Sequence, residues 1–206
     1  MKNLKIEKPS VAEVERYLKI WHDDIEYEKY RRQEDSVTML FRELYPKNTE
    51  IKEVLIKVSV LNDFYGANIF DVYPVARHIV ELDIDSSLNK ADLDIVDKIS
   101  RAKGVKKRHY SFATKYCSHH RPDVYPIYDR FVNKVLTYFK DEFYMSENFD
   151  LKNYQIFKCV YQTFIEQYKL EKFSLREVDW YLWILGKENF PPPPKKRKLM
   201  GMNNNQ

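Results

Sequence analysis

Apolar residues recur at helical spacing along almost the whole of this 206-residue chain. Residues three or four positions apart, such as Val14, Leu18 and Trp21, share one face of a helix. The sequence has no sustained period-two alternation and no Asn-Gly or Asp-Gly pair, which are typical of strands and hairpins. The pattern therefore predicts an all-α fold, with one helical domain over residues 1–190.

Two serine-led segments predict helix starts. Ser10-Val-Ala-Glu13 and Ser174-Leu-Arg-Glu177 each match a capping box, in which Ser and Glu side chains satisfy free backbone amides. Gly186 predicts the end of the last helix near Leu185, because glycine is a common helix stop. The remaining helices are expected over residues 36–44, 50–63, 70–81, 91–102, 108–119, 129–145 and 152–170.

The end of the chain has a different composition. Residues 191–206 begin with four prolines, continue with Lys195, Lys196, Arg197 and Lys198, and finish in polar residues. Such a segment cannot bury a core, so we expect a disordered tail. Its Pro-Lys-Lys-Arg-Lys-Leu string resembles a basic nuclear import signal, and in a bacterium it would act as a weak nucleic-acid arm.

Several classes of protein are excluded by composition. The chain has no apolar run of about 18 residues and no signal-peptide pattern, so we expect neither a membrane span nor secretion. Two cysteines cannot form a disulfide framework, which indicates a reducing compartment. The expected location is cytoplasmic, with association to the nucleoid if the protein is bacterial and a nuclear location if it is eukaryotic.

Positive charge is concentrated in one segment. The chain carries a formal net charge of +4, yet residues 101–121 hold seven basic residues and no acidic one. Such a local excess predicts an anionic partner, most simply double-stranded DNA. The alternative interpretation is a solvated basic helix face without a partner. No obligatory protein partner is evident from the sequence.

The same segment has the pattern of a helix–hairpin–helix motif. One helix is expected to end near Ala102 and the next to begin near Arg108, with Gly104 where the backbone turns sharply. Exposed backbone amides beside basic side chains suit contacts with phosphates. The predicted DNA-binding residues of the hairpin are Lys103, Gly104, Lys106, Lys107 and Arg108.

The helix after the hairpin is expected to be amphipathic. At 100° per residue, one side should face the core and a second set of residues lies opposite. The predicted core side holds His109, Phe112, Ala113, Tyr116 and Cys117. The opposite side holds Arg108, Ser111, Lys115, Ser118 and His119.

Two prolines, Pro122 and Pro126, predict an extended segment that stops at Asp129. Asp is a favoured N-cap, so one interpretation of Asp129 is the cap of the following helix. The other is a carboxylate facing a cleft beside Lys115. The two roles are compatible.

The run from Ser111 to Asp129, SFATKYCSHHRPDVYPIYD, resembles the lysine-to-aspartate segment of the helix–hairpin–helix DNA glycosylase superfamily. The likeness is greatest to divergent bacterial proteins with an oxoguanine-glycosylase-type fold. Gly66-Ala-Asn-Ile69 also resembles the asparagine-rich turn of that superfamily, which implies a DNA contact for Asn68.

The resemblance implies a DNA repair enzyme without a metal or other cofactor. Such enzymes flip a damaged base out of the duplex and cut its glycosidic bond. In bifunctional members a lysine forms a Schiff base with the sugar and acts as an AP lyase, while an aspartate stabilises the sugar cation. The catalytic candidates are Lys115 as nucleophile and Asp129 as carboxylate.

Departures from the superfamily pattern keep other interpretations open. Lys106 replaces the second hairpin glycine, and Lys115 precedes Asp129 by fourteen residues where the superfamily has about eighteen or nineteen. Lys107, twenty-two residues before Asp129, is the other candidate nucleophile. A catalytically silent DNA-binding module and a helical protein–protein adaptor are the alternative functions. We expect Trp180 and Trp183 to belong to the core.

Overall fold

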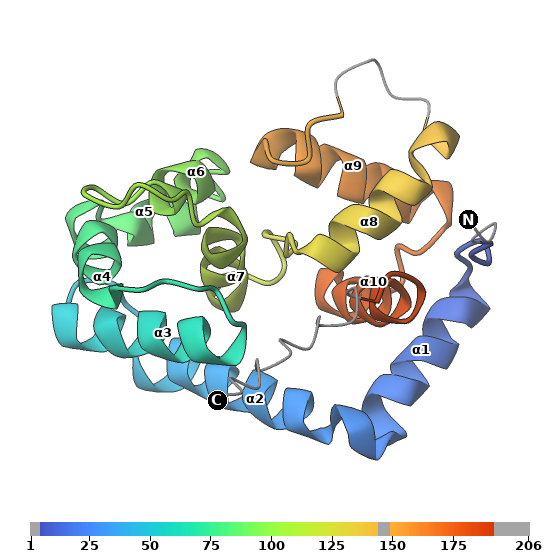
Figure 1. The fold of residues 1–206 in the computed structure, drawn as a ribbon, viewed down its shortest axis with the longest axis horizontal. Helices are drawn as coiled ribbons and strands as arrows, with labels where there is room; N and C mark the ends of the chain where they lie inside the picture. The colour runs from blue at the N-terminus through green and yellow to red at the C-terminus, as the bar shows by residue number, and fades with distance from the viewer. Residues whose placement is uncertain (1–4, 144–148, 192–206) are drawn as a thin grey trace, which may run out of the picture.

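The computed structural model of the chain describes residues 5–143 and 149–191, and within these ranges it contains helices but no strand (Figure 1). The predicted all-α class is therefore confirmed. The α-helices are α1 (Val11–Asp23), α2 (Glu28–Met39), α3 (Ile51–Phe64), α4 (Val72–Glu81), α5 (Ile84–Asn89), α6 (Asp94–Ser100), α7 (Tyr110–His120), α8 (Arg130–Tyr138), α9 (Tyr154–Gln167) and α10 (Leu175–Asn189). Short 3-10 turns cover Ile25–Tyr27 and Lys140–Glu142, and a π-helical turn covers Leu40–Leu44.

The helices form two groups. Helices α3 to α7 lie on one side and α8 to α10 on the other, while α1 and α2 run along the base of both (Figure 1). Helix α7 is the inner member of its group and faces α8 and α10. No helix in the described part of the chain is long and apolar enough to cross a membrane.

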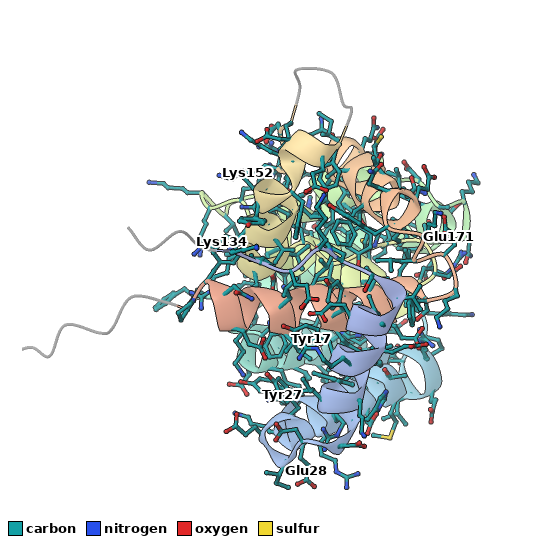
Figure 2. All side chains as sticks on the ribbon, turned by 90° about the vertical axis from the view of Figure 1, so that its right-hand side faces the viewer. Tyr17, Tyr27, Glu28, Lys134, Lys152 and Glu171 are labelled. Atoms are coloured by element: carbon teal, nitrogen blue, oxygen red, sulfur yellow. The ribbon has the colours of Figure 1, made fainter. Side chains whose placement is uncertain are left out.

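Helix α1 joins the second group by crossing α10, with Tyr17 between the two helices (Figure 2). The Tyr17 hydroxyl donates to the Glu188 carboxylate at 2.6 Å, and its ring meets that of Tyr181 edge-on at 5.4 Å. A long-range hydrogen bond and an aromatic contact thus attach the first helix to the last.

The two predicted capping boxes have different outcomes. At Ser174 the box is complete, since its hydroxyl accepts from the Glu177 amide and the Glu177 carboxylate accepts from the Ser174 amide. At Ser10 the hydroxyl accepts from the Glu13 amide, but the Glu13 carboxylate pairs with Arg16 at 2.7 Å. The Glu13 carboxylate is bound to the Arg16 guanidinium, so the second hydrogen bond of the capping box is not formed.

Helix boundaries differ most around the predicted hairpin. Helix α6 ends at Ser100 and α7 begins at Tyr110, so residues 101–109 connect them and the turn is longer than predicted. Gly104 has φ +79°, a conformation that favours glycine, and the His109 amide closes the connection on the Ser100 carbonyl at 2.9 Å. Assignment of this connection to a helix–hairpin–helix motif stays a prediction.

Other helix boundaries also differ from the predicted ones, mainly in polar segments where the apolar periodicity is weak. Helix α5 and the first turns of α2 were not predicted, because both are rich in charged or polar residues. Helix α8 ends at Tyr138, earlier than the predicted 145, and residues 144–148 and 192–206 lie outside the described residues. The predicted disordered tail therefore falls outside them, apart from Pro191.

Helix α7 is buried on nearly all sides. The predicted core side is confirmed, but Lys115, Ser118 and His119 are buried as well. These three lie opposite the predicted core side and are buried because α10 covers that second side of α7: the Arg176 guanidinium donates to the Ser118 hydroxyl at 3.2 Å. The periodicity of one helix does not reveal how many other helices pack against it.

Gly186 lies inside α10 and does not end it, so the predicted helix stop was also wrong. A Cβ at this position would lie 2.7 Å from the Phe131 Cβ and 2.9 Å from the Phe131 carbonyl oxygen. The missing side chain lets α10 approach the first turn of α8 closely. Since Asp129 precedes that turn, the glycine also fixes the distance between α10 and Asp129.

Replacing Gly186 with Ala should destabilise the protein. Alanine is favoured over glycine in a helix by about 1 kcal/mol, but overpacking against backbone typically costs about 1–3 kcal/mol. We expect a lower melting temperature, measured by circular dichroism, with exposed Lys19→Ala on α1 as a near-neutral control. A stabilised Gly186→Ala variant would contradict the close approach of α8 and α10.

Candidate functional site

A cleft of about 700 Å³ opens between the two groups of helices. Its volume lies in the range of small-molecule sites. Residues from α2, α7, α8 and α10 line it together with the turn after α3. Its charged residues include Glu34, Lys115, Asp129, Arg176 and Asp179.

The two predicted catalytic residues line the same cleft. Thr114 and Tyr128, which directly precede Lys115 and Asp129, are hydrogen-bonded to each other: the Tyr128 amide donates to the Thr114 hydroxyl at 3.1 Å. The Thr114 hydroxyl in turn donates to the Ser111 carbonyl at 2.9 Å, and we call these two hydrogen bonds the clamp. The clamp holds the end of the proline segment against α7. Lys115 and Asp129, which are fourteen positions apart in the sequence, therefore line the same cleft.

Lys115 is 8% exposed, and its amine donates to the Ser111 hydroxyl at 2.7 Å. Burial lowers the pKa of this amine, Arg176 acts in the same direction, and Asp129 and Asp179 oppose the shift. Arg108 and Arg121, which flank Lys115 in the sequence, pair with Asp97 and Asp123.

Asp129 is the N-cap of α8, as one interpretation predicted. Its Oδ1 accepts from the amides of Phe131 at 2.7 Å and Val132 at 2.8 Å. Its Oδ2 receives no hydrogen bond from the described residues, and the residue lines the cleft. The cap holds the carboxylate in one orientation and leaves an oxygen for a second role.

A largely buried ion pair lines the same cleft as Lys115. The Arg176 guanidinium of α10 lies 3.2 Å from the Glu34 carboxylate of α2, and both side chains are about 85% buried. The Tyr65 hydroxyl donates to Glu34 at 3.0 Å and lies 2.9 Å from the His119 ring nitrogen Nε2. These contacts link α2, α3, α7 and α10 in one polar network.

Asp179 adds a third carboxyl group. It is buried at 9% exposure, lines the cleft, and its Oδ1 has no hydrogen-bond partner among the described residues. Burial raises the pKa of this carboxyl above its ordinary value, Arg176 opposes the shift, and Asp129 supports it. A buried carboxyl without a hydrogen-bonded cation is a candidate functional group.

Aromatic rings line much of the cleft. Trp180 and Trp183 were expected in the core; they are half-buried, pack against the core and also line the cleft. Trp180 stacks on Trp21 at 5.0 Å, and the Trp183 ring meets Tyr30 at the same distance. Flat aromatic walls of this kind suit a planar ring system.

The predicted basic segment is partly neutralised by acidic neighbours. Both Arg101 and Arg108 lie within hydrogen-bond distance of Asp97, while Lys103 is 3.9 Å from Glu81. Lys106 and Lys107 are exposed and remain the basic residues most available to a partner. Lys107 does not line the cleft, whereas Lys115 does.

The asparagine-rich turn lies at the rim of the cleft. Asn68 lines it, is exposed, and has φ +55°, and its side chain donates to the Gly66 carbonyl at 2.8 Å. Asn tolerates this left-handed conformation better than most residues. Phe70, two positions later, is fully exposed.

The opposite rim carries two basic residues that sequence reasoning missed. Arg130 and Lys134 line the cleft, are exposed, and stand one turn apart on α8. Figure 2 shows Lys134 on the outer surface of the molecule. They have no acidic partner within ion-pair distance in the described ranges, so they add positive charge at the entrance.

Sequence reasoning also missed Glu34, Arg176 and Asp179. One signal was present: Arg176, Asp179 and the two tryptophans share one helical face of α10, the face that lines the cleft. A charged pair on an aromatic face predicts either an ion pair or a polar site. In the described part of the chain, no three potential metal ligands come together.

Comparison with known proteins places the chain in a family. A family model designated HI_0787_N and described as an N-terminal domain matches residues 13–124, just over half of the chain. The chain belongs to the HI_0787_N family. It is 44% identical over 149 residues to a Haemophilus influenzae protein described as uncharacterized, covering 70% of this chain and 71% of the relative. No solved structure matches the chain significantly.

The family match divides the cleft. Glu34 and Lys115 fall within the matched residues, whereas Asp129, Arg176 and Asp179 follow them. The polar network therefore joins the matched N-terminal part of the chain to the helices after it.

Replacing Glu34 with Gln should destabilise the protein by about 3–5 kcal/mol, because it leaves the Arg176 charge buried without its counter-ion. Urea unfolding followed by tryptophan fluorescence measures the change. The double variant Glu34→Gln/Arg176→Met removes both charges and should recover most of the loss. A single variant as stable as the wild type would mean that this pair is well solvated.

Proposed function

We propose that this protein is a DNA repair glycosylase with AP lyase activity, acting on a base flipped into the cleft. The observation that carries the proposal is the joint placement of Lys115 and Asp129 in that cleft. The resemblance of residues 111–129 to the glycosylase superfamily, stated from the sequence, supports the same reaction.

Lys115 supplies the nucleophile in this proposal. An amine attacks only when it is unprotonated, and the burial that lowers the pKa of Lys115 increases the unprotonated fraction at neutral pH. The hydrogen bond to Ser111 holds the side chain in place. Its nitrogen attacks the sugar C1′, and loss of the base leads to a Schiff base between lysine and sugar.

Asp129 stabilises the positive charge that develops on the sugar. Its Oδ1 is held by two amides of α8, so Oδ2 keeps a fixed position without reorganisation during the reaction. The aromatic side chains of Tyr30, Trp180 and Trp183 offer faces on which a flipped base stacks.

The rim of the cleft is suited to the DNA backbone. Arg130 and Lys134 line the cleft, whereas Lys106 and Lys107 do not, and all four are exposed cations that can contact phosphates. Asn68 lies on the rim as well and is proposed to contact the duplex where the base leaves it. The proposed function requires a compartment that contains DNA, which is the cytoplasm with its nucleoid in a bacterium and the nucleus in a eukaryote.

Borohydride trapping on a duplex that carries an abasic site tests the proposal. Lys115→Ala should abolish the covalent adduct, because trapping requires the amine that forms the Schiff base. Lys107→Ala should still form the adduct and should weaken DNA binding at all sequences alike, since it removes a phosphate contact. Gel electrophoresis detects the adduct, and fluorescence anisotropy at two salt concentrations measures binding.

Three outcomes would overturn this assignment. Loss of trapping in Lys107→Ala, with trapping retained in Lys115→Ala, would make Lys107 the nucleophile. Salt-dependent DNA binding by a wild type that forms no adduct would favour a catalytically silent DNA-binding module. Absence of DNA binding at low salt would favour a helical adaptor.

Asp129→Asn separates the cap from the catalytic role. Asn caps a helix nearly as well as Asp, so the free energy of unfolding should change by less than about 1 kcal/mol. The variant loses the negative charge, and base excision should slow by a factor of about 100 or more. Single-turnover excision and thermal melting measure the two effects.

Asp129→Ala is the matched comparison. It should lose both the charge and the cap, and the missing cap costs about 1 kcal/mol more than in Asp129→Asn. Full excision activity in Asp129→Asn would show that Asp129 acts only as a helix cap.

A further inference from the structure

Asp179 lines the cleft but has no part in the reaction proposed above. It lies one turn after Arg176 on α10, and its buried Oδ1 accepts no hydrogen bond from the described residues. Unpartnered buried carboxyl oxygens are unusual, because desolvation without a hydrogen bond is costly. A ligand or a bound proton would satisfy this atom.

Charged groups face Asp179 from each neighbouring helix. Those that act on its titration are Lys115 of α7, Asp129 at the start of α8, Glu34 of α2 and Arg176 of α10, and the hydroxyls of Tyr65 and Tyr161 lie near enough to be perturbed by it. Two cations and three carboxyl groups, Asp179 included, are thus gathered in one largely buried cluster.

Most of these charges are already balanced. Arg176 pairs with Glu34 at 3.2 Å, and Asp129 accepts two amides at the positive end of α8. Lys115 and Asp179 remain, and neither has an ionic partner within hydrogen-bond distance in the described part of the chain.

Moving one proton from the Lys115 ammonium to the Asp179 carboxylate leaves two neutral groups. In a desolvated site the neutral pair avoids the cost of burying two unpaired charges. Burial acts on both pKa values in this sense, since it lowers that of Lys115 and raises that of Asp179. A free amine and a carboxylic acid are the resting state that this arrangement favours.

We infer that Asp179 holds a proton at neutral pH and is the general acid that delivers it to the departing base. This role rests on the proposed function. The Lys115 nitrogen forms a bond to C1′, and the bond from C1′ to the base nitrogen breaks with its electron pair on the base. The Asp179 proton moves to that base nitrogen, so the base leaves neutral. The Asp179 carboxylate then takes a proton from the newly formed alkylammonium of Lys115.

A duplex with an abasic site distinguishes a general acid from a residue that only supports the structure. At an abasic site no base departs, so no proton has to be delivered to it, while Lys115 still forms the Schiff base. A purely structural residue would affect both substrates alike.

The experiment compares Asp179→Asn with the wild type on duplexes containing 8-oxoguanine, hypoxanthine or an abasic site. Asp179→Asn should slow excision of the base that the wild type removes by about 100-fold or more. Trapping at the abasic site should stay near that of the wild type. Exposed Asp35→Asn on α2, outside this cleft, is the control and should change neither readout.

The pH profile gives a second kinetic readout. Excision by the wild type should fall on the alkaline side as Asp179 loses its proton, and this limb should be missing from the residual activity of Asp179→Asn. Equal losses of excision and trapping, or full excision by Asp179→Asn, would overturn the role of Asp179. A wild type that fails to trap at the abasic site overturns the proposed function instead.

The protonation state can be measured without any activity. In protein labelled with ¹³C at the aspartate carboxyl carbons, NMR should show one resonance that titrates far above the ordinary range of Asp, and Asp179→Asn should remove it. Titration of every aspartate in the ordinary range would overturn the proton-holding state, whatever the fate of the proposed reaction.

Discussion

The ion pair between Arg176 and Glu34 is the contact on which the cleft depends. It joins the last helix to α2 at a point where water is excluded, and Tyr65 extends it to His119 on α7. A desolvated pair holds its two helices together, because loss of either partner leaves a buried charge without a counter-ion. Helix α10 is thus fixed beside α7, and every other group of the site is placed relative to these two helices.

A second constraint sets the position of α8. The Thr114 hydroxyl accepts from the Tyr128 amide, and Gly186 lets the first turn of α8 contact α10 without an intervening side chain. Asp129 lies between these two contacts. Its oxygen atoms therefore have little freedom, although the segment before it is an extended loop with two prolines, Pro122 and Pro126.

Features that depend on neighbouring residues could be predicted from the sequence. The helical class, the box at Ser174 and the cap at Asp129 follow from short-range backbone requirements, and all three are present. The burial of Lys115 could not be predicted, because it depends on α10, sixty residues further along the chain. Gly186 was misassigned for the same reason: a close approach to Phe131 and a helix end both favour glycine, and only the packing distinguishes them.

In this protein, the effect of burial on a charged group depends on whether a counter-ion lies within hydrogen-bond distance. Where a counter-ion lies within hydrogen-bond distance, as at Arg176 and Glu34, exclusion of water strengthens the attraction and holds helices together. Where it does not, as at Lys115, the same exclusion disfavours the charged form and lowers the pKa of the amine. Arg176 itself also lowers the pKa of Lys115, so the ion pair that holds α10 against α2 places a cation near this amine. In the proposed reaction, this shift favours the unprotonated amine that attacks the sugar.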